Sequence, residues 1–135
     1  MIGRVWRGWA EPERAGEYEV HFRGEVLAAL GEVPGCRGGY LLRRDDADGV
    51  EFVTLTLFDS LDAVRAFAGE EYERAVVAPG AQAALRDYER TVRHYEIVAG
   101  MAPLNPPFWG TLGGKQAGDF VQEPQRESPP SIGGI

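Results

Sequence analysis

The sequence predicts an α+β fold of the ferredoxin-like type, because residues 1–98 show apolar periodicities in the order strand, helix, strand, strand, helix, strand. This βαββαβ order predicts an antiparallel sheet with helices on one face. A second observation concerns the middle hairpin, whose second strand is apolar in both of its alternating sets of positions. The sets are Val53, Leu55 and Leu57, and Phe52, Thr54, Thr56 and Phe58. Because a sheet covered on one side needs only one apolar face, we expect the second face to pack against another copy of the chain in a homodimer.

The first two elements are a strand over roughly residues 2–10 and a helix that begins near Pro12. Alternation in the strand places two sets of side chains on opposite faces. The sets are Ile2, Arg4 and Trp6, and Val5, Arg7 and Trp9. Proline fits the first turn of the helix, and apolar residues then recur at helical spacing from Tyr18 to Val33. The helix is expected to end at Val33-Pro34-Gly35, since a residue before proline disfavours helical angles.

A hairpin and a further helix follow. The hairpin begins at Tyr40, closes around Asp46-Ala47-Asp48-Gly49 and returns through Phe58. Asp59 lies where a helix N-cap is expected, and Gly69 is expected to break the helix.

The rest of the domain is predicted to hold two more helical segments and one strand. The helical segments span Glu71–Val77 and about Ala81–Glu89. The strand spans Thr91–Val98, and alternation places His94 on the same face as Val92 and Glu96.

Composition excludes several classes of partner. The chain carries 21 acidic and 14 basic side chains, a net charge of −7, and the acidic residues are dispersed. Neither binding to nucleic acid nor binding to an anionic membrane is expected from such a charge pattern. The sole cysteine, Cys36, and the absence of a long apolar run or a signal-peptide pattern predict a cytoplasmic protein.

The residue inventory also narrows the chemistry. Residues 1–98 contain no lysine, which excludes Schiff-base chemistry there, and Ser60 is their only serine. The two histidines have no metal-ligand spacing, and no glycine-rich phosphate loop opens a helix. We therefore expect neither a metal nor a cofactor.

The histidines are the groups suited to proton transfer near neutral pH. His21 lies at the edge of the apolar stripe of the first helix, where a packing or solvated role is the simpler interpretation. His94 lies on a sheet strand and is the candidate for acid–base chemistry, with core packing as the alternative.

Three segments carry a family resemblance: Phe52 to Phe67, Arg4-Val5-Trp6-Arg7-Gly8 and Arg93-His94-Tyr95-Glu96. Residues 1–98 resemble the antibiotic-biosynthesis-monooxygenase-like group of the dimeric α+β barrel superfamily. The resemblance implies two sheets packed face to face, with a pocket in each subunit between the sheet and its helices. It also implies oxidation of small aromatic or polyketide-like phenols by oxygen without a bound cofactor, which is plausible because an electron-rich phenolate can itself reduce oxygen.

For such a reaction, His94 is the proposed base, and Arg4 or Arg7 is the proposed partner of a developing oxyanion. Activity is then expected to rise with pH through the pKa of His94. That pKa should lie near ~6.5, shifted by burial and by neighbouring carboxylates. Side chains that can line the pocket come from several elements. They are Trp6, Tyr40, Thr54, Thr56, Phe58 and Tyr72. The competing hypothesis is a non-catalytic ligand-binding or regulatory dimer that uses the same pocket.

A heme-degrading branch of the same superfamily fits poorly. Its members use an Asn on the first strand, a Trp at the end of the third and a His on the second helical segment. The corresponding places here hold Trp6 or Arg7, Phe58 and Val76.

Residues 99–135 are predicted to be a tail outside the domain, since the last 36 residues hold six of the nine prolines and seven of the eighteen glycines. Phe108-Trp109 is expected to dock on the domain or on a partner, with a mobile tail as the alternative. The segment from Ser131 to Ile135, which includes Ile132, loosely resembles the short peptides that direct cargo enzymes into encapsulin shells. The tail is therefore a candidate interaction arm.

Overall fold

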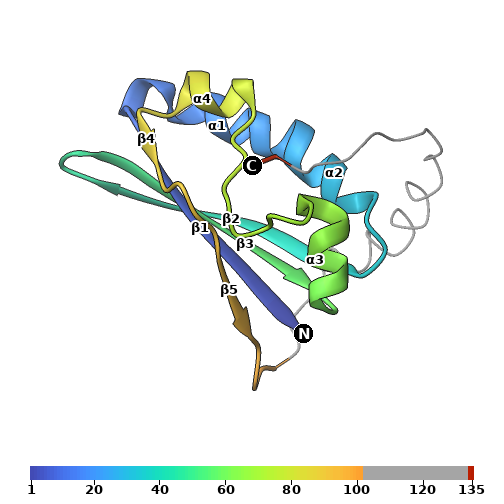
Figure 1. Cartoon of the computed structure of the whole chain (residues 1–135). Coiled ribbons are helices and arrows are strands. Elements are labelled where there is room, and N and C mark those ends of the chain that lie inside the picture. The colour runs from blue at the N-terminus through green and yellow to red at the C-terminus, as the bar shows by residue number, and fades with distance from the viewer. Residues whose placement is uncertain (102–133) are drawn as a thin grey trace, which may run out of the picture.

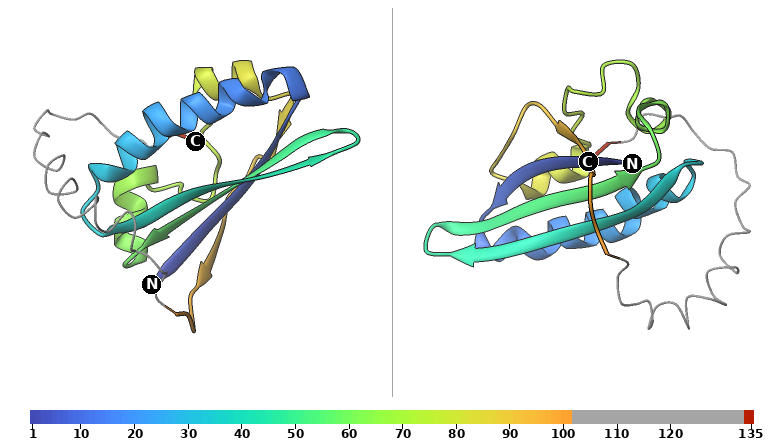
Figure 2. Two further views of the ribbon diagram at one scale, coloured as in Figure 1. Left: turned by 180° about the vertical axis from the view of Figure 1, so that it is seen from behind. Right: turned by 90° about the horizontal axis from the view of Figure 1, so that it is seen from below.

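The computed structural model describes residues 1–101 and 134–135 and shows an antiparallel sheet with all helices on one side (Figure 1). The strands are β1 (Ile2–Ala10), β2 (Cys36–Asp46), β3 (Gly49–Phe58), β4 (Asp87–Tyr88) and β5 (Arg93–Glu96). Their order is β2-β3-β1-β4, and β5 also pairs with β1. The views in Figure 2 agree that the opposite side of the sheet carries no helix. The predicted α+β class is confirmed.

The central pair β1 and β3 separates two faces of the sheet. Residues 4, 6, 8 and 10 of β1 are buried under the helices, and their partners on β3 are buried with them. Trp6, Phe52 and Phe58 are fully buried there and form the centre of the core. Val53, Leu55 and Leu57 alternate with these residues and remain partly exposed on the other face. The two-faced hairpin predicted from sequence is thus observed in the single chain.

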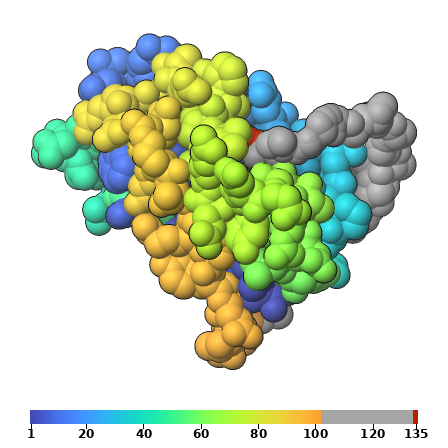
Figure 3. All heavy atoms as spheres, in the orientation of Figure 1, coloured from blue at the N-terminus to red at the C-terminus, as the bar shows by residue number. Residues whose placement is uncertain are grey.

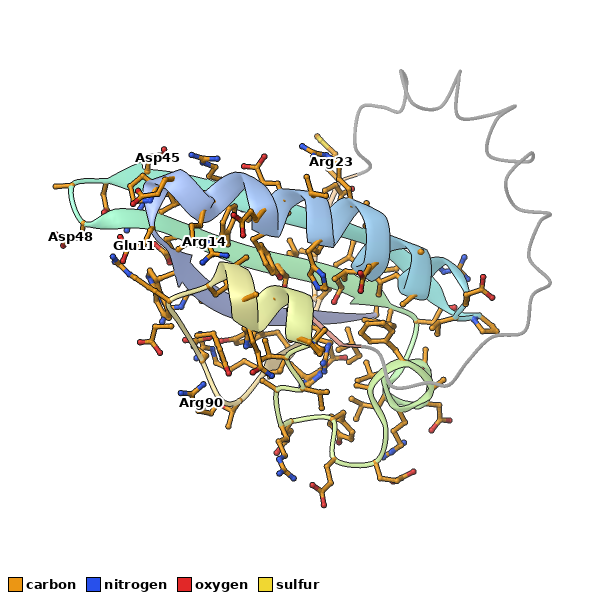
Figure 4. The ribbon with its side chains drawn as sticks, turned by 90° about the horizontal axis from the view of Figure 1, so that it is seen from above. Glu11, Arg14, Arg23, Asp45, Asp48 and Arg90 are labelled. Atoms are coloured by element: carbon orange, nitrogen blue, oxygen red, sulfur yellow. The ribbon has the colours of Figure 1, made fainter. Side chains whose placement is uncertain are left out.

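A long helical segment covers the inner face above β2 and β3 (Figure 4). It consists of η1 (Pro12–Arg14), α1 (Ala15–His21), the π-helical turn η2 (Phe22–Val26) and α2 (Leu27–Gly31). The buried residues are Tyr18, Phe22, Val26 and Leu30, spaced four apart, as an apolar stripe requires. A Cβ on Gly39 would lie 2.8 Å from the Leu30 side chain, so glycine on β2 allows α2 to approach the sheet.

The hairpin between β2 and β3 closes over two residues, Ala47 and Asp48. The Asp48 N–H donates to the Asp46 carboxylate at 2.9 Å, and Gly49 has a φ of 143°. Figure 4 shows Asp48 at the tip of this hairpin. The predicted turn is correct, although β2 begins at Cys36, earlier than the predicted start.

The helix after the hairpin is α3 (Leu61–Ala68), and its N-cap is Ser60, one residue later than predicted. The Ser60 Oγ accepts from the Ala63 N–H at 3.2 Å. Asp59 instead forms a two-pronged ion pair with Arg37 at 2.7 and 2.8 Å. The helix ends at Gly69, with a φ of 93°, as expected.

The helix predicted over Glu71–Val77 is not formed. This segment is an extended loop, in which Arg74 pairs with Thr91 and the Ala75 N–H donates to the Arg90 carbonyl. The next helix, α4 (Pro79–Ala84), is shorter than predicted, because residues 86–89 leave the helix to bond to β1. The Arg86 N–H donates to the Trp9 carbonyl and the Glu89 N–H to the Arg7 carbonyl. Backbone bonds to a distant segment have replaced local helical bonds in both places, to residues 90–92 in the first and to β1 in the second.

The predicted tail lies almost entirely outside the described residues, so the division of the chain near residue 98 stays a prediction. Phe108, Trp109 and Ile132 lie outside the described part, whereas Ile135 is described and is buried. Among the described residues, none of the helices has the length and apolar character needed to cross a membrane.

Candidate functional site

Arg4 is a buried guanidinium on the inner face of β1. The residue is only 3% exposed, and its Nη1 donates to the Tyr72 carbonyl at 2.9 Å. The same Nη1 lies 3.0 Å from His94 Nε2. Arg4 and His94 are direct partners in the β1–β5 ladder, and cross-strand partners project to the same face. Strand alternation therefore brings both side chains under α3 and the loop that follows it.

Within the described part of the chain, no carboxylate lies within ion-pair distance of the Arg4 guanidinium. Burial lowers the pKa of Arg4 to about 10, so the group stays protonated at neutral pH. The Phe67 ring of α3 lies 5.7 Å from the guanidinium carbon. A buried charge without a counter-ion is costly to the fold, and such groups are concentrated at functional sites. Arg4 is therefore a candidate binding group for an anion.

His94 is neutral at neutral pH in this arrangement. Burial, and secondly the charge of Arg4, lower its pKa to about 4. Arg4 has only donors, so His94 Nε2 must accept, and the ring proton is assigned to Nδ1. Nδ1 is buried and has no hydrogen-bond partner among the described residues. The site thus contains a second donor, the His94 Nδ1–H, on the side of the ring away from Arg4.

The wall of the site comes from neighbouring strands. Thr56 is the β3 partner of Arg4, and Thr54 is the partner of Trp6. Both threonines are buried. The Trp6 indole is fixed, since its Nε1–H donates to the Glu89 carbonyl at 2.8 Å.

Aromatic rings close the site on the helix side. Phe58 packs against Phe67 with ring centroids 5.8 Å apart. Tyr72 meets His94 edge to face at 5.1 Å. Figure 3 shows the surface over this region, where residues 69–78 lie against the last described strand. A surface pocket of about 410 Å³ opens there, lined by residues 70–74 and Thr91. Tyr72 lines this pocket and also contacts His94.

Two of the predicted site residues lie elsewhere. Arg7 projects to the opposite face of the sheet, where it pairs with Glu89 at 3.0 Å and Glu51 at 3.6 Å. Tyr40 is the partner of Leu55 and lies on that same outer face. Because successive strand residues alternate in direction, neither can contact a ligand bound at Arg4. Of the two predicted arginines, only Arg4 lies on the same face of the sheet as His94.

Sequence reasoning missed two contributors to the interior. Phe67 is not among the site residues predicted from the sequence, yet its ring lies against both Arg4 and Phe58. Tyr18 is fully buried, and its hydroxyl has no partner among the described residues. Burial raises the pKa of that hydroxyl. The apolar stripe of the first helix indicated that Tyr18 is buried, but nothing in the stripe indicated an unpaired hydroxyl.

The described residues contain no group of three or more potential metal ligands. The model of the antibiotic biosynthesis monooxygenase family matches residues 1–79. The chain belongs to that family. The matched range includes Arg4, Trp6 and Tyr72, whereas His94 lies beyond it.

Several solved structures are similar to this chain. A Bacillus cereus protein assigned to the antibiotic biosynthesis monooxygenases has a TM-score of 0.54 and 13% identity, covering 77% of this chain and 97% of its own. This likeness supports the family fold alone. SnoaB, a cofactor-independent oxygenase from Streptomyces nogalater, has a TM-score of 0.44 and 22% identity, with coverages of 77% and 97%. A Deinococcus radiodurans protein assigned to the same family has a TM-score of 0.46 and 17% identity, with coverages of 78% and 100%. None of the curated proteins matches the sequence.

Proposed function

We propose that this protein is a cofactor-independent monooxygenase that acts on a small aromatic or polyketide-like substrate bound at Arg4 and His94. One observation carries the proposal: Arg4 is a buried cation with no carboxylate partner among the described residues. Membership of the antibiotic biosynthesis monooxygenase family supports the reaction class. The substrate and the roles of the residues are the proposal's own.

The guanidinium of Arg4 suits an oxygen that becomes negatively charged. A phenol or enol that releases its proton to solvent on binding leaves an oxyanion, which can accept from the free N–H groups of Arg4. His94 Nδ1–H lies on the side of its ring away from Arg4, where it can donate to a second oxygen of the substrate. Donors held in place beforehand stabilise such a charge more than water does, because they need no reorganisation. The fully buried rings of Trp6 and Phe58 make the interior beside this site apolar. Arg4 would therefore lower the pKa of the bound phenol.

The oxidation then uses the electrons of the substrate. For an anthrone, one O₂ is consumed, the CH₂ carbon of the central ring becomes a carbonyl, and one water leaves. The two hydrogens of that water come from the CH₂ group, and the second oxygen atom of O₂ is retained in the product. The protein binds the anion and orients it, and the substrate supplies both electron pairs.

The role of His94 follows from its hydrogen bond. A base role at Nε2 requires that His94 first release Arg4, and a pKa of about 4 makes the ring a weak base. We therefore assign His94 as a donor, through Nδ1–H, to a second oxygen of the substrate. The sequence predicts that activity rises with pH near pH 6.5. The lowered pKa of His94 moves this rise to about pH 4, so activity that stays constant between about pH 5 and 8 is compatible with an essential His94.

Oxygen uptake with a panel of anthrones and hydroquinones tests the function. We expect uptake with at least one substrate, and a fall of about a hundredfold or more in kcat/KM for Arg4→Met, as for loss of one oxyanion donor. Arg23→Met is the matched control, since Arg23 is 67% exposed and pairs with Glu19 on the far side of α1. No uptake with any member of the panel, or an unchanged rate in Arg4→Met, would contradict the proposal.

The alternative is a non-catalytic ligand-binding or regulatory protein. It is favoured by one observation, which is that His94 presents a donor and no free base at the site. Calorimetric titration of the same panel without oxygen separates the two. Binding that requires Arg4 but gives no oxygen uptake in air supports the alternative.

A further inference from the structure

Residues 134 and 135 lie inside the fold. Ile135 is 4% exposed and belongs to the hydrophobic core. Its N–H donates to the Val76 carbonyl at 3.0 Å, and its carbonyl oxygen lies 3.3 Å from His21 Nε2. A Cβ on Gly134 would lie 3.4 Å from the Ala78 side chain, so Gly134 follows the same loop closely. Figure 1 shows this end of the chain between α1 and the loop that leads into α4.

The surroundings of Ile135 form a socket that is built from α1, α4 and the loop of residues 69–78. His21 of α1 is only 8% exposed, and its ring packs on Tyr18 at 5.7 Å. A Cβ on Gly80 would come within 3.0 Å of His21 Nδ1, so α4 also holds the ring. Because the Ile135 oxygen is an acceptor, His21 Nε2 must carry the proton that joins them. His21, which has no role in the candidate site, thus has a structural partner in Ile135.

An isoleucine on an extended backbone suits this socket. Its branched side chain has few rotamers, so burying it costs little conformational entropy. Its main chain adds one strand-like bond from the N–H to Val76 and one contact of a main-chain oxygen with His21. Burial of the apolar side chain and hydrogen bonding of the main chain therefore both stabilise Ile135 in the socket.

The socket is connected to the Arg4 site through the loop of residues 69–78. Val76 of this loop bonds to Ile135, and Tyr72 of the same loop bonds to Arg4 through its carbonyl. The Tyr72 ring also lies against His94. On its other side the loop is tied to residues 90–92, through Ala75 and Glu73. Ile135 thus supports the side of the loop that has no strand beside it.

We propose that the socket of His21, Val76 and Ala78 is a binding site for an isoleucine carried by an extended peptide. Gly134–Ile135 of the same chain occupy this socket. Their binding holds the loop of residues 69–78 against Arg4 and His94. Ile135 is then a positioning residue for the candidate site. The proposal concerns the conformation of the loop and stands whether or not the protein is an oxygenase.

Amide hydrogen exchange in the full-length protein tests the proposal, with Ile135→Ala as the main variant. Ile135→Val keeps a β-branched apolar side chain and should behave like the wild type. Val20→Ala is the matched control, because Val20 is 66% exposed on α1 beside His21. The reporters are the amides of Arg74 and Ala75, which are bonded within and beside the loop. The amides of the β1–β3 ladder report on the rest of the fold.

In Ile135→Ala we expect exchange at Arg74 and Ala75 to accelerate by about ten- to a hundredfold, which is what burial of one isoleucine side chain is worth in an equilibrium constant. The β1–β3 amides should keep their wild-type rates.

NMR titration should show the pKa of His94 rising from about 4 toward its ordinary value, since a released loop no longer buries the ring. The proposal is overturned if loop exchange and the His94 titration are unchanged in Ile135→Ala, or if Ile135→Val disturbs them equally. Oxygen uptake plays no part in these readouts, so failure here is distinct from failure of the proposed function.

Discussion

Arg4 combines burial and charge in a way that stability alone does not explain. The guanidinium is held by two acceptors, the Tyr72 carbonyl and His94 Nε2, neither of which is an anion. Such a group is retained at a cost to the fold, which fits a role in binding. The stability of Arg4 variants therefore carries information about function.

We expect Arg4→Met to unfold at an equal or higher urea concentration than the wild type. Methionine fills similar volume without a buried charge, and such replacements are neutral or stabilising by about 1–4 kcal/mol. Urea unfolding monitored by circular dichroism measures the change. A loss above about 3 kcal/mol would show instead that Arg4 is a structural residue whose two hydrogen bonds outweigh its desolvation.

His94 makes stability depend on pH. Its pKa is about 4 in the folded chain against an ordinary value of 6.5, so between these values the unfolded chain binds a proton that the folded chain does not. The free energy of unfolding should therefore decrease as the pH is lowered from about 6.5 to about 4. Because the ring is partly exposed, we expect a contribution on the order of 1 kcal/mol, well below the full value of the shift.

The comparison that isolates this contribution uses His94→Gln, which can still accept from Arg4 but does not titrate. Unfolding curves at pH 7 and pH 4.5 should show a smaller loss of stability in the variant than in the wild type. Equal losses in the two proteins would mean that carboxylates alone account for the pH dependence.

At the scale of the element, α3 shows how one side chain sets a helix start. Ser60 accepts from the Ala63 N–H, which otherwise has no partner in the first turn. Ser60→Ala should lower the free energy of unfolding by about 1 kcal/mol, whereas Ser60→Asp should stay near the wild type because aspartate also caps. Thermal and urea unfolding of both variants measure this. If Ser60→Ala were as stable as the wild type, the cap would contribute nothing here.

The loop of residues 69–78 shows the opposite situation, in which an element is shaped by distant partners. Its residues have helical spacing, but Glu73, Arg74 and Ala75 instead pair with residues 90–92. Backbone bonds to another segment satisfy the same donors and acceptors as a helix would. This exchange places the Tyr72 carbonyl beside Arg4.

At the scale of the whole molecule, the outer face of the sheet is the main unpartnered apolar surface of the described chain. Val53, Leu55 and Leu57 are partly exposed there, and Leu42 and Tyr95 are 48% and 53% exposed. Patches of this kind mark interfaces in soluble proteins. We propose that this face pairs with a second copy and buries more than ~2,000 Å² in total, as stable homodimers do.

Leu55→Arg tests this interface, because Leu55 lies at the centre of the face between β1 and β2. We expect sedimentation at micromolar concentration to give a dimer for the wild type and a monomer for the variant. Leu61→Arg is the control, since Leu61 is 37% exposed on α3, away from this face, and should leave the dimer intact. A wild-type monomer at that concentration would contradict the proposed dimer.

The sequence by itself determined the α+β class, the two-residue hairpin turn, the break at Gly69 and the two faces of β1 and β3. These features depend on residues close in the chain, namely alternation, turn residues and helical spacing, so local patterns predict them. The same alternation placed Arg4 and Trp6 on one face and Arg7 on the other.

Only the tertiary structure decided which residues meet across long separations. Arg4 bonds to Tyr72 and His94, which lie 68 and 90 residues away, and His21 meets Ile135 across 114 residues. The helix predicted over residues 71–77 did not form, and the one predicted over about residues 81–89 ended at Ala84, because distant segments offered their backbone groups equivalent bonds. The pKa of His94 is lowered because burial and the Arg4 charge act on it through space. Periodicity contains no information about such contacts, since they depend on how the elements pack.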